Sequence, residues 1–283
     1  MEMTQKQSLG RNLWHSITPI LGYSFCQLLP TTFVFMVMVI HEVWLAENGN
    51  AIFDTSFFEG IIYSIAFIIS GFIYTLFIRS EWKSTKEQLP KYEHKYNVYK
   101  LAFTVFFTYF GIKTLVISLI SLSGLLNYFP SDRVDTMSQG SAIMHFIAAV
   151  IVAPVVEEIC FRGFVQNRIM SWMKPKYAVV FQALIFGIIH GNQLQMLTAS
   201  ISGLMLGLLY MRYRQIWPCI IGHMAFNFFA SVFNHIPSID IALILVQMLI
   251  IGLILTFVGG FLLLKQPAAV PVFDNQNDSI YEL

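Results

Sequence analysis

Long apolar runs alternate with short polar connections along this chain of 283 residues. An apolar run of about 20 residues is long enough to cross a bilayer as a helix. By this criterion the sequence predicts eight spans, at residues 18–43, 57–78, 101–126, 141–172, 177–192, 195–211, 215–234 and 239–264. The fifth and sixth are short and could be tilted, re-entrant or buried within the bundle. We therefore expect an all-α, polytopic membrane helical bundle with about eight transmembrane helices.

Composition agrees with this interpretation, because 56% of the residues are hydrophobic and only 12% are charged. Soluble domains are nearer to a quarter charged. The net charge of +1 offers no basis for nucleic-acid binding. Three cysteines, Cys26, Cys160 and Cys219, lie far apart in apolar segments, so they predict buried apolar side chains and no disulfide framework.

Lysine and arginine collect in alternate connections. The connection 79–100 holds Arg79, Lys83, Lys86, Lys91, Lys95 and Lys100, and later ones hold Arg168, Lys174 and Lys176, then Arg212 and Arg214. The remaining connections carry few basic residues. Positive residues mark the cytoplasmic side. The first apolar run is long and lacks a signal cleavage site, so it is expected to be a span. We expect a multi-pass protein of a plasma membrane, of the bacterial kind, with both termini in the cytoplasm.

The fourth span contains two adjacent carboxylates and an arginine, Glu157, Glu158 and Arg162. Ionisable groups at membrane depth are costly unless they pair or take part in chemistry. On a helix, Glu158 and Arg162 are four residues apart and share a face. Glu157 is rotated from Glu158 by about 100°. The spacing therefore predicts that Glu158 is engaged by the arginine while Glu157 is available.

The next three spans add further polar positions at helical spacing. Phe186 and His190 are four residues apart, and so are His223 and Asn227. Gly203 and Gly207 form a small-residue surface that allows another helix to approach closely. The carboxylates, two imidazoles and an amide can therefore converge on one polar intramembrane cavity.

Such a set of groups can activate water. A buried carboxylate can act as a general base, with one histidine polarising the water and a histidine–amide pair stabilising an oxyanion. Neither a serine nor a cysteine is placed as an obvious nucleophile, and Cys160 is a poor candidate. A lone Lys113 in the third span is expected to find a partner in a structural ion pair.

The ordered motifs Glu157-Glu158-x-x-x-Arg162, Phe186-x-x-x-His190 and His223-x-x-x-Asn227 resemble those of the CPBP intramembrane protease family, also called the Abi or CAAX protease and bacteriocin-processing family. The Ras-converting CAAX endopeptidase is its eukaryotic relative. The resemblance covers residues 140–230. It implies catalytic core helices at 141–235. The apolar runs and charges place N-terminal membrane helices before them (1–140, with the basic cytoplasmic loop 79–100), and a last membrane helix (236–265) and a flexible cytoplasmic tail (266–283) after them.

The resemblance implies a glutamate-dependent peptide-bond hydrolase acting in or beside the membrane. Glu157 and His190 would activate the water, and His223 and Asn227 would stabilise the oxyanion. Glu158, Arg162 and Phe186 would support the site. No cofactor is expected, although Glu157, His190 and His223 could form a zinc site.

The leading hypothesis is an intramembrane endopeptidase acting on a membrane-associated or lipidated peptide or protein. A non-enzymatic immunity or scaffold protein, such as a bacteriocin immunity factor, could use the same residues to bind a peptide partner. A transporter or ion pathway could also use buried carboxylates. A transporter with broken helices would be supported by an internal repeat, and the sequence shows none.

Overall fold

The structure is a computed structural model of residues 1–283. It describes residues 9–49, 61–62, 65–76, 78–79, 90–128, 146–190, 193–233 and 241–272, and statements about contacts below concern these residues. The loop segment 80–89, the connections around Asp54 and Asp132, and the predicted tail from residue 273 onwards lie outside them.

Helices dominate the described chain. They are α1 (Leu9–Asn48), α3 (Val98–Leu122), η1 (Leu125–Tyr128), η3 (Ile147–Val152), α5 (Ala153–Glu158), η4 (Ile159–Gln166), α6 (Asn167–Met170), α7 (Pro175–Ile188), α8 (Gln193–Tyr213), α9 (Ile216–Phe233) and α10 (Ile241–Leu264). A short helix also covers Ile65–Leu76. Two short strands, β1 (Tyr92–Glu93) and β2 (Val270–Pro271), pair antiparallel. The all-α class is thus confirmed.

Three of the described helices are long and apolar enough to cross a membrane: Val98–Leu122, Gln193–Tyr213 and Leu243–Leu264. Shorter apolar helices cover Ile65–Leu76, Pro175–Ile188 and Ile216–Ser231. These helices lie within or close to the ranges predicted from the apolar runs. The fifth predicted span is indeed short, whereas the sixth grows to the 21 residues of α8.

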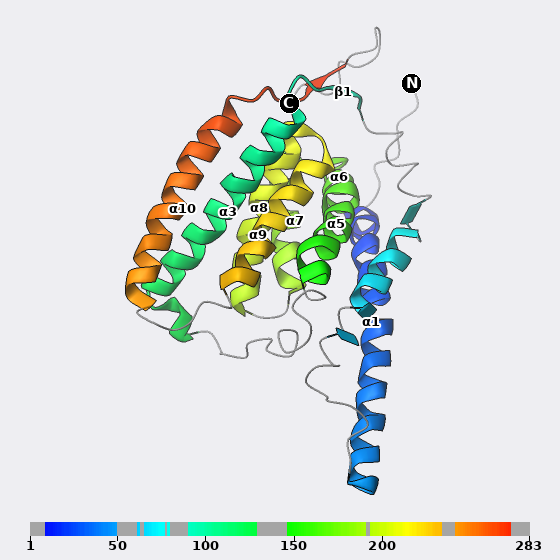
Figure 1. Ribbon diagram of the computed structural model, residues 1–283. Helices are drawn as coiled ribbons and strands as arrows, with labels where there is room; N and C mark the ends of the chain where they lie inside the picture. The colour runs from blue at the N-terminus through cyan, green and yellow to red at the C-terminus, as the bar shows by residue number, and fades with distance from the viewer. Residues whose placement is uncertain are drawn as a thin grey trace, which may run out of the picture.

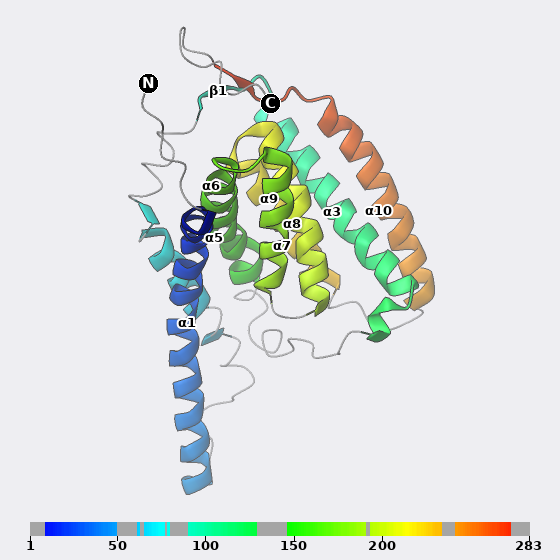
Figure 2. The ribbon, with the colours of Figure 1, turned by 180° about the vertical axis from the view of Figure 1, so that it is seen from behind.

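Helices α3 and α5 to α10 lie side by side in a bundle, and the C-terminal part of α1 extends beyond it (Figures 1 and 2). The outermost helix, α10, packs on α3, which in turn packs on α9, while α7 pairs with α8. The segments η3, α5, η4 and α6 follow one another without a break, and we call them together the site helix (147–170). Its π-helical part η4 contacts both α1 and α7. The site helix therefore lies between α1 and the other helices of the core.

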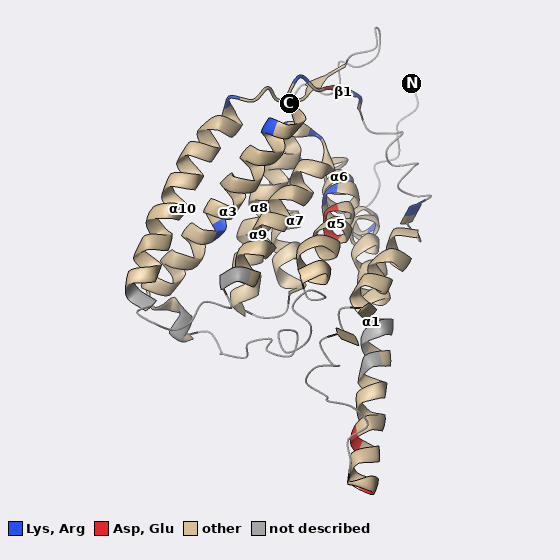
Figure 3. Ribbon diagram, viewed as in Figure 1, with Lys and Arg blue, Asp and Glu red and all other residues tan. Residues whose placement is uncertain are grey.

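One end of the bundle carries most of the described basic residues (Figure 3). The guanidinium of Arg212 donates to the carbonyls of Leu264 and Gln266 at 2.8 and 2.7 Å, which joins the ends of α8 and α10. The strand pair β1–β2 lies at the same end (Figure 1). The connections that the charge pattern assigned to one side thus meet at one end of the molecule.

The site helix departs from regular α-helix over η3 and η4. A π-helical turn adds a residue and disturbs the regular backbone hydrogen bonding. The side-chain amide of Asn167 donates to the carbonyls of Arg162 and Gly163 at 2.9 and 3.0 Å. Tyr210 of α8 exchanges a further hydrogen bond with Asn167. The site helix is thereby hydrogen-bonded to α8 at Asn167, nine residues after Glu158.

Candidate functional site

The glutamate pair lies at the end of α5, and both carboxyl side chains are buried. The Nη1 atom of Arg162 donates to Oε1 of Glu158 at 2.8 Å, in the pairing that the helical spacing predicted. The Nδ1 atom of His223, on α9, lies 2.8 Å from the same oxygen. Glu158 is therefore engaged from two helices.

Arg162 is completely buried and connects three elements. Its Nη2 atom donates to the carbonyl of Gly203 on α8 at 2.9 Å. Its guanidinium also lies 5.1 Å from the ring centre of Phe186 on α7, within the range of a cation–π contact. A Cβ at Gly203 would lie only 3.1 Å from the Cα of Ala183, so glycine permits the close helix approach that the sequence predicted.

Glu157 points in another direction. Its Oε1 atom accepts a hydrogen bond from the hydroxyl of Tyr23, on α1, at 3.2 Å. Its Oε2 atom lies 3.9 Å from Nε2 of His223 and has no hydrogen-bond partner among the described residues. That distance is too long for a direct hydrogen bond, but one water about 2.8 Å from each atom would fit. Oε2 of Glu158 likewise has no hydrogen-bond partner among the described residues, so Glu157 differs in that its unpartnered oxygen faces an imidazole nitrogen.

His190 lies at the end of α7, against Phe186. Its Nδ1 atom is 2.7 Å from the carbonyl of Phe186, and the two ring centres are 4.9 Å apart. The Phe186 ring also contacts His223, whose ring centre is 5.7 Å from that of Phe186. In the described chain, His190 makes neither a hydrogen bond nor an ion pair with Glu157. The imidazole beside Glu157 is that of His223.

Asn227 lies one turn beyond His223 on α9. Its Nδ2 atom donates to the carbonyl of Ala149 in η3 at 2.8 Å. One of its two amide hydrogens is thus bonded to the backbone of the site helix, and the other has no acceptor among the described residues. The amide and the His223 imidazole share a face of α9, as their spacing predicted.

Both histidines have Nδ1 beside an oxygen that accepts a hydrogen bond. A carbonyl only accepts, so Nδ1 of His190 carries the hydrogen. The Glu158 carboxylate, paired with Arg162, imposes the same tautomer on neutral His223. Each neutral ring then presents an unprotonated Nε2, the atom that accepts from water or binds a metal.

The arrangement gives little support to a three-residue metal site. Across the described ranges, no group of three or more His, Cys, Asp or Glu side chains lies together in a way that could hold a metal ion. The set Glu157, His190 and His223 is split by the Phe186 ring, which contacts both imidazoles. Glu157 and His223 alone would supply two ligands.

Several polar residues at the site gave no signal in the sequence. Tyr23 is a single tyrosine in a long apolar helix, with no motif around it. Gln166 and Gln182 donate to the carbonyls of Gly207 and Gly203 at 3.2 and 2.9 Å, and their side-chain oxygens have no partner among the described residues. Their proximity depends on helix packing, which residue spacing within one span does not reveal.

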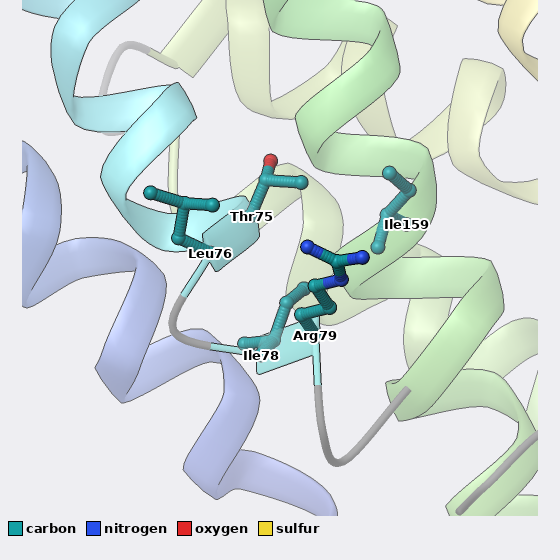
Figure 4. A pocket seen from close by; sticks show the side chains of 5 residues that line it. All are labelled: Thr75, Leu76, Ile78, Arg79 and Ile159. Atoms are coloured by element: carbon teal, nitrogen blue, oxygen red, sulfur yellow. The ribbon is translucent and has the colours of Figure 1, made fainter. Parts of the chain in front are cut away.

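A hollow of about 320 Å³ lies beside the site helix, lined by Thr75, Leu76, Ile78, Arg79 and Ile159 (Figure 4). Ile159 directly follows the glutamate pair, and Arg79 is the one charged residue in this lining. The walls are otherwise mainly apolar. This hollow is distinct from the polar cluster around Glu157.

Comparison with known proteins matches the part of the chain that holds these residues. Residues 139–229 match the family model described as "Type II CAAX prenyl endopeptidase Rce1-like". A Bacillus subtilis (strain 168) protein described as "Putative membrane peptidase YdiL" is 27% identical over 124 residues, which cover 41% of this chain and 51% of that protein. The match thus spans about half the length of this relative. No solved structure matches the chain. The part of the chain that holds the site, residues 139–229, is thus similar to CAAX-type membrane peptidases, in agreement with the resemblance of its motifs to the CPBP family.

Proposed function

We propose that this protein is an intramembrane endopeptidase that hydrolyses a peptide bond of a membrane-associated or lipidated substrate by glutamate-dependent water activation. The observation that carries the proposal is the 3.9 Å gap between Oε2 of Glu157 and Nε2 of His223. A water in this gap would touch a base and a second polar group at once.

In the proposed reaction, Glu157 takes a proton from this water while the water oxygen bonds to the carbonyl carbon of the substrate. The carbonyl oxygen becomes an oxyanion. When the tetrahedral intermediate collapses, the carbon–nitrogen bond breaks, and the proton on Glu157 passes to the leaving amine. Glu158 and Arg162 hold His223 in place through the 2.8 Å contacts described above.

The oxyanion requires hydrogen-bond donors at the reacting carbonyl. Asn227 has one amide hydrogen available, because the other is held by the Ala149 carbonyl. His223, one turn away, carries its hydrogen on Nδ1 while neutral, so its expected part in stabilising the oxyanion requires a second proton, on Nε2. His190 lies beyond Phe186, so its expected part in holding the water requires its side chain to move toward Glu157 when substrate binds.

The proposed setting is a bacterial plasma membrane with the basic end of the bundle in the cytoplasm. Described basic residues gather at that end (Figure 3), in agreement with the positive-inside rule. The apolar hollow beside Ile159 supports a substrate with an apolar segment. The proposed partners are therefore such a substrate and the bilayer itself, and the proposed mechanism requires no cofactor.

The decisive experiment compares membrane peptidomes of cells that express wild type, Glu157→Gln or His190→Ala at matched levels. Glu93→Gln, at an exposed position on β1, is the matched control for loss of a carboxylate. Peptide ends produced by wild type and Glu93→Gln but absent from the other two variants would support proteolysis and identify the bond. Identical peptidomes with the phenotype retained would instead favour the immunity or scaffold function. Flux in liposomes that depends on Glu157 would favour transport.

A further inference from the structure

The carboxylate proposed as the base is held by a helix outside the family-matched core. Tyr23 lies on α1, 134 residues before Glu157, and its side chain is only 7% exposed. Its hydroxyl donates to Oε1 of Glu157 at 3.2 Å. A carboxylate held at one oxygen has a restricted orientation, so the opposite oxygen is directed to a defined place. Here the opposite oxygen, Oε2, faces His223.

Other contacts place α1 against the site helix. The Nη1 atom of Arg168, on α6, donates to the carbonyl of His15 at 2.7 Å and to the hydroxyl of Thr18 at 3.0 Å. Trp172 donates from its ring nitrogen to the hydroxyl of Ser16 at 3.2 Å. These bonds lie within about two helical turns of Tyr23, on the same helix. These bonds fix the position of the N-terminal part of α1 along the axis of the site helix.

The ring of Tyr23 is also held in place. It packs edge-on against Tyr74, with ring centres 5.5 Å apart. Tyr74 is fully buried, and its hydroxyl donates to the carbonyl of Pro19 at 3.2 Å. Pro19 precedes Tyr23 by one turn. The Tyr23 hydroxyl therefore reaches Glu157 from a ring supported by the neighbouring helix Ile65–Leu76, which is itself bonded to α1.

We infer that Tyr23 is a positioning residue of this site: its hydroxyl fixes the Glu157 carboxylate so that Oε2 faces the water and His223. The expected effect on catalysis rests on the proposed function. The hydrogen bond between Tyr23 and Glu157 is independent of that function. It gives α1 a part in the chemistry, although α1 lies outside residues 139–229, which match the family model. If α1 served only to anchor the protein in the membrane, a buried hydroxyl at Tyr23 would not be required.

The test uses the full-length protein in detergent, with Tyr23→Phe compared with wild type. The matched control is Tyr213→Phe, which also removes a buried tyrosine hydroxyl, one that donates to the backbone carbonyl of Leu263 at 3.0 Å. Tyr213 lies at the basic end of α8, away from Glu157. Both substitutions keep the aromatic ring, and thermal unfolding confirms that each variant is folded.

The kinetic readout is cleavage of the peptide bond identified by the peptidome comparison. Loss of a hydrogen bond to a charged group corresponds to about a 10- to 100-fold effect. We expect Tyr23→Phe to lower kcat by about this factor with KM unchanged, while Tyr213→Phe retains wild-type values. An unchanged kcat in Tyr23→Phe, or an equal loss in both variants, would overturn the inference.

A second readout does not depend on turnover. Dicyclohexylcarbodiimide modifies carboxyl groups in apolar surroundings, and mass spectrometry of the peptide that contains Glu157 reports the rate. Removing the Tyr23 hydroxyl frees Oε1, so we expect Glu157 to be modified several-fold faster in Tyr23→Phe and at the wild-type rate in Tyr213→Phe. Equal rates in all three proteins would refute the contact. If wild type cleaves no peptide, the proposed function fails, and this rate alone decides whether Tyr23 holds Glu157.

Discussion

The pair α3–α10 and the group formed by the site helix, α7, α8 and α9 both bring helices close together at glycine. In the first pair, a Cβ at Gly111 would lie 2.6 Å from the Cβ of Leu255 and 2.9 Å from the backbone nitrogen of Thr256. In the second group, a Cβ at Gly207 would lie 2.6 Å from Nε2 of Gln182. The neighbours at these two glycines differ: Gly111 meets backbone and apolar atoms, whereas the nearest neighbour of Gly207 is a polar side chain.

The hydroxyl groups of α3 show the same difference. Those of Thr104, Thr108, Thr114 and Ser118 each donate to the carbonyl four residues earlier in the same helix, at 2.6–2.8 Å. All four donate within α3, and Thr104 also accepts a hydrogen bond from Nε2 of Gln266, just beyond the end of α10, at 3.4 Å. Around Glu157, by contrast, the polar bonds cross between helices. Close packing dominates the contact between α3 and α10, whereas polar bonds between helices surround the proposed water.

The largest expected effect is on activity. Glu157→Gln removes the base but keeps the size of the side chain, so we expect cleavage to fall by about 10²- to 10⁴-fold, the usual contribution of a general base. Initial rates on the peptide identified above measure the loss. Unfolding temperature is expected to stay near that of wild type, because the amide oxygen of the substituted side chain can still accept the hydrogen bond from Tyr23. A variant with normal turnover would contradict the proposed mechanism.

Arg162→Met is expected to have the largest effect on stability. It leaves Glu158 buried without its cation, and breaking a buried pair in this way costs about 3–5 kcal/mol. Denaturation in mixed micelles measures the change. The double variant Glu158→Gln/Arg162→Met should recover much of the loss, because no unpaired charge remains. A double variant no more stable than the single one would show that Arg162 acts mainly through Gly203 and Phe186.

Gly111→Val tests the other half of the comparison. The added side chain would push α10 away from α3, and overpacking of this kind costs about 1–3 kcal/mol. Cleavage per folded molecule should remain, because the contact lies outside the polar cluster. Gly260→Ala on α10 is the control, since a Cβ there meets nothing within 4 Å. Activity lost in parallel with stability would mean that the two halves are coupled.

Lys113→Met should have the smallest effect. Lys113 is partly buried on α3, and within the described ranges it has no hydrogen bond or ion pair, so the partner expected from the sequence is not found there. We expect stability to change by less than about 1 kcal/mol, in line with substitutions that remove no specific contact. The same denaturation assay measures it. A loss of several kcal/mol would reveal a partner outside the described residues.

The sequence by itself determined the properties that depend on local spacing and composition. Apolar run length predicts the helices, and the four-residue separation of Glu158 and Arg162 predicts a pair that the structure places at 2.8 Å. The close approach at Gly203 follows equally from the absence of a side chain. The roles assigned to Glu157, His190, His223 and Asn227 stay predictions.

Only the tertiary structure decided which helix faces meet. It places His223, rather than His190, beside Glu157, and it brings Tyr23 to the same carboxylate from 134 residues away. The π-helical turns of η3 and η4 also have no signature in the spacing of apolar residues. The physical reason is that helical periodicity is local, whereas the neighbour of each face is chosen by the packing of the whole bundle.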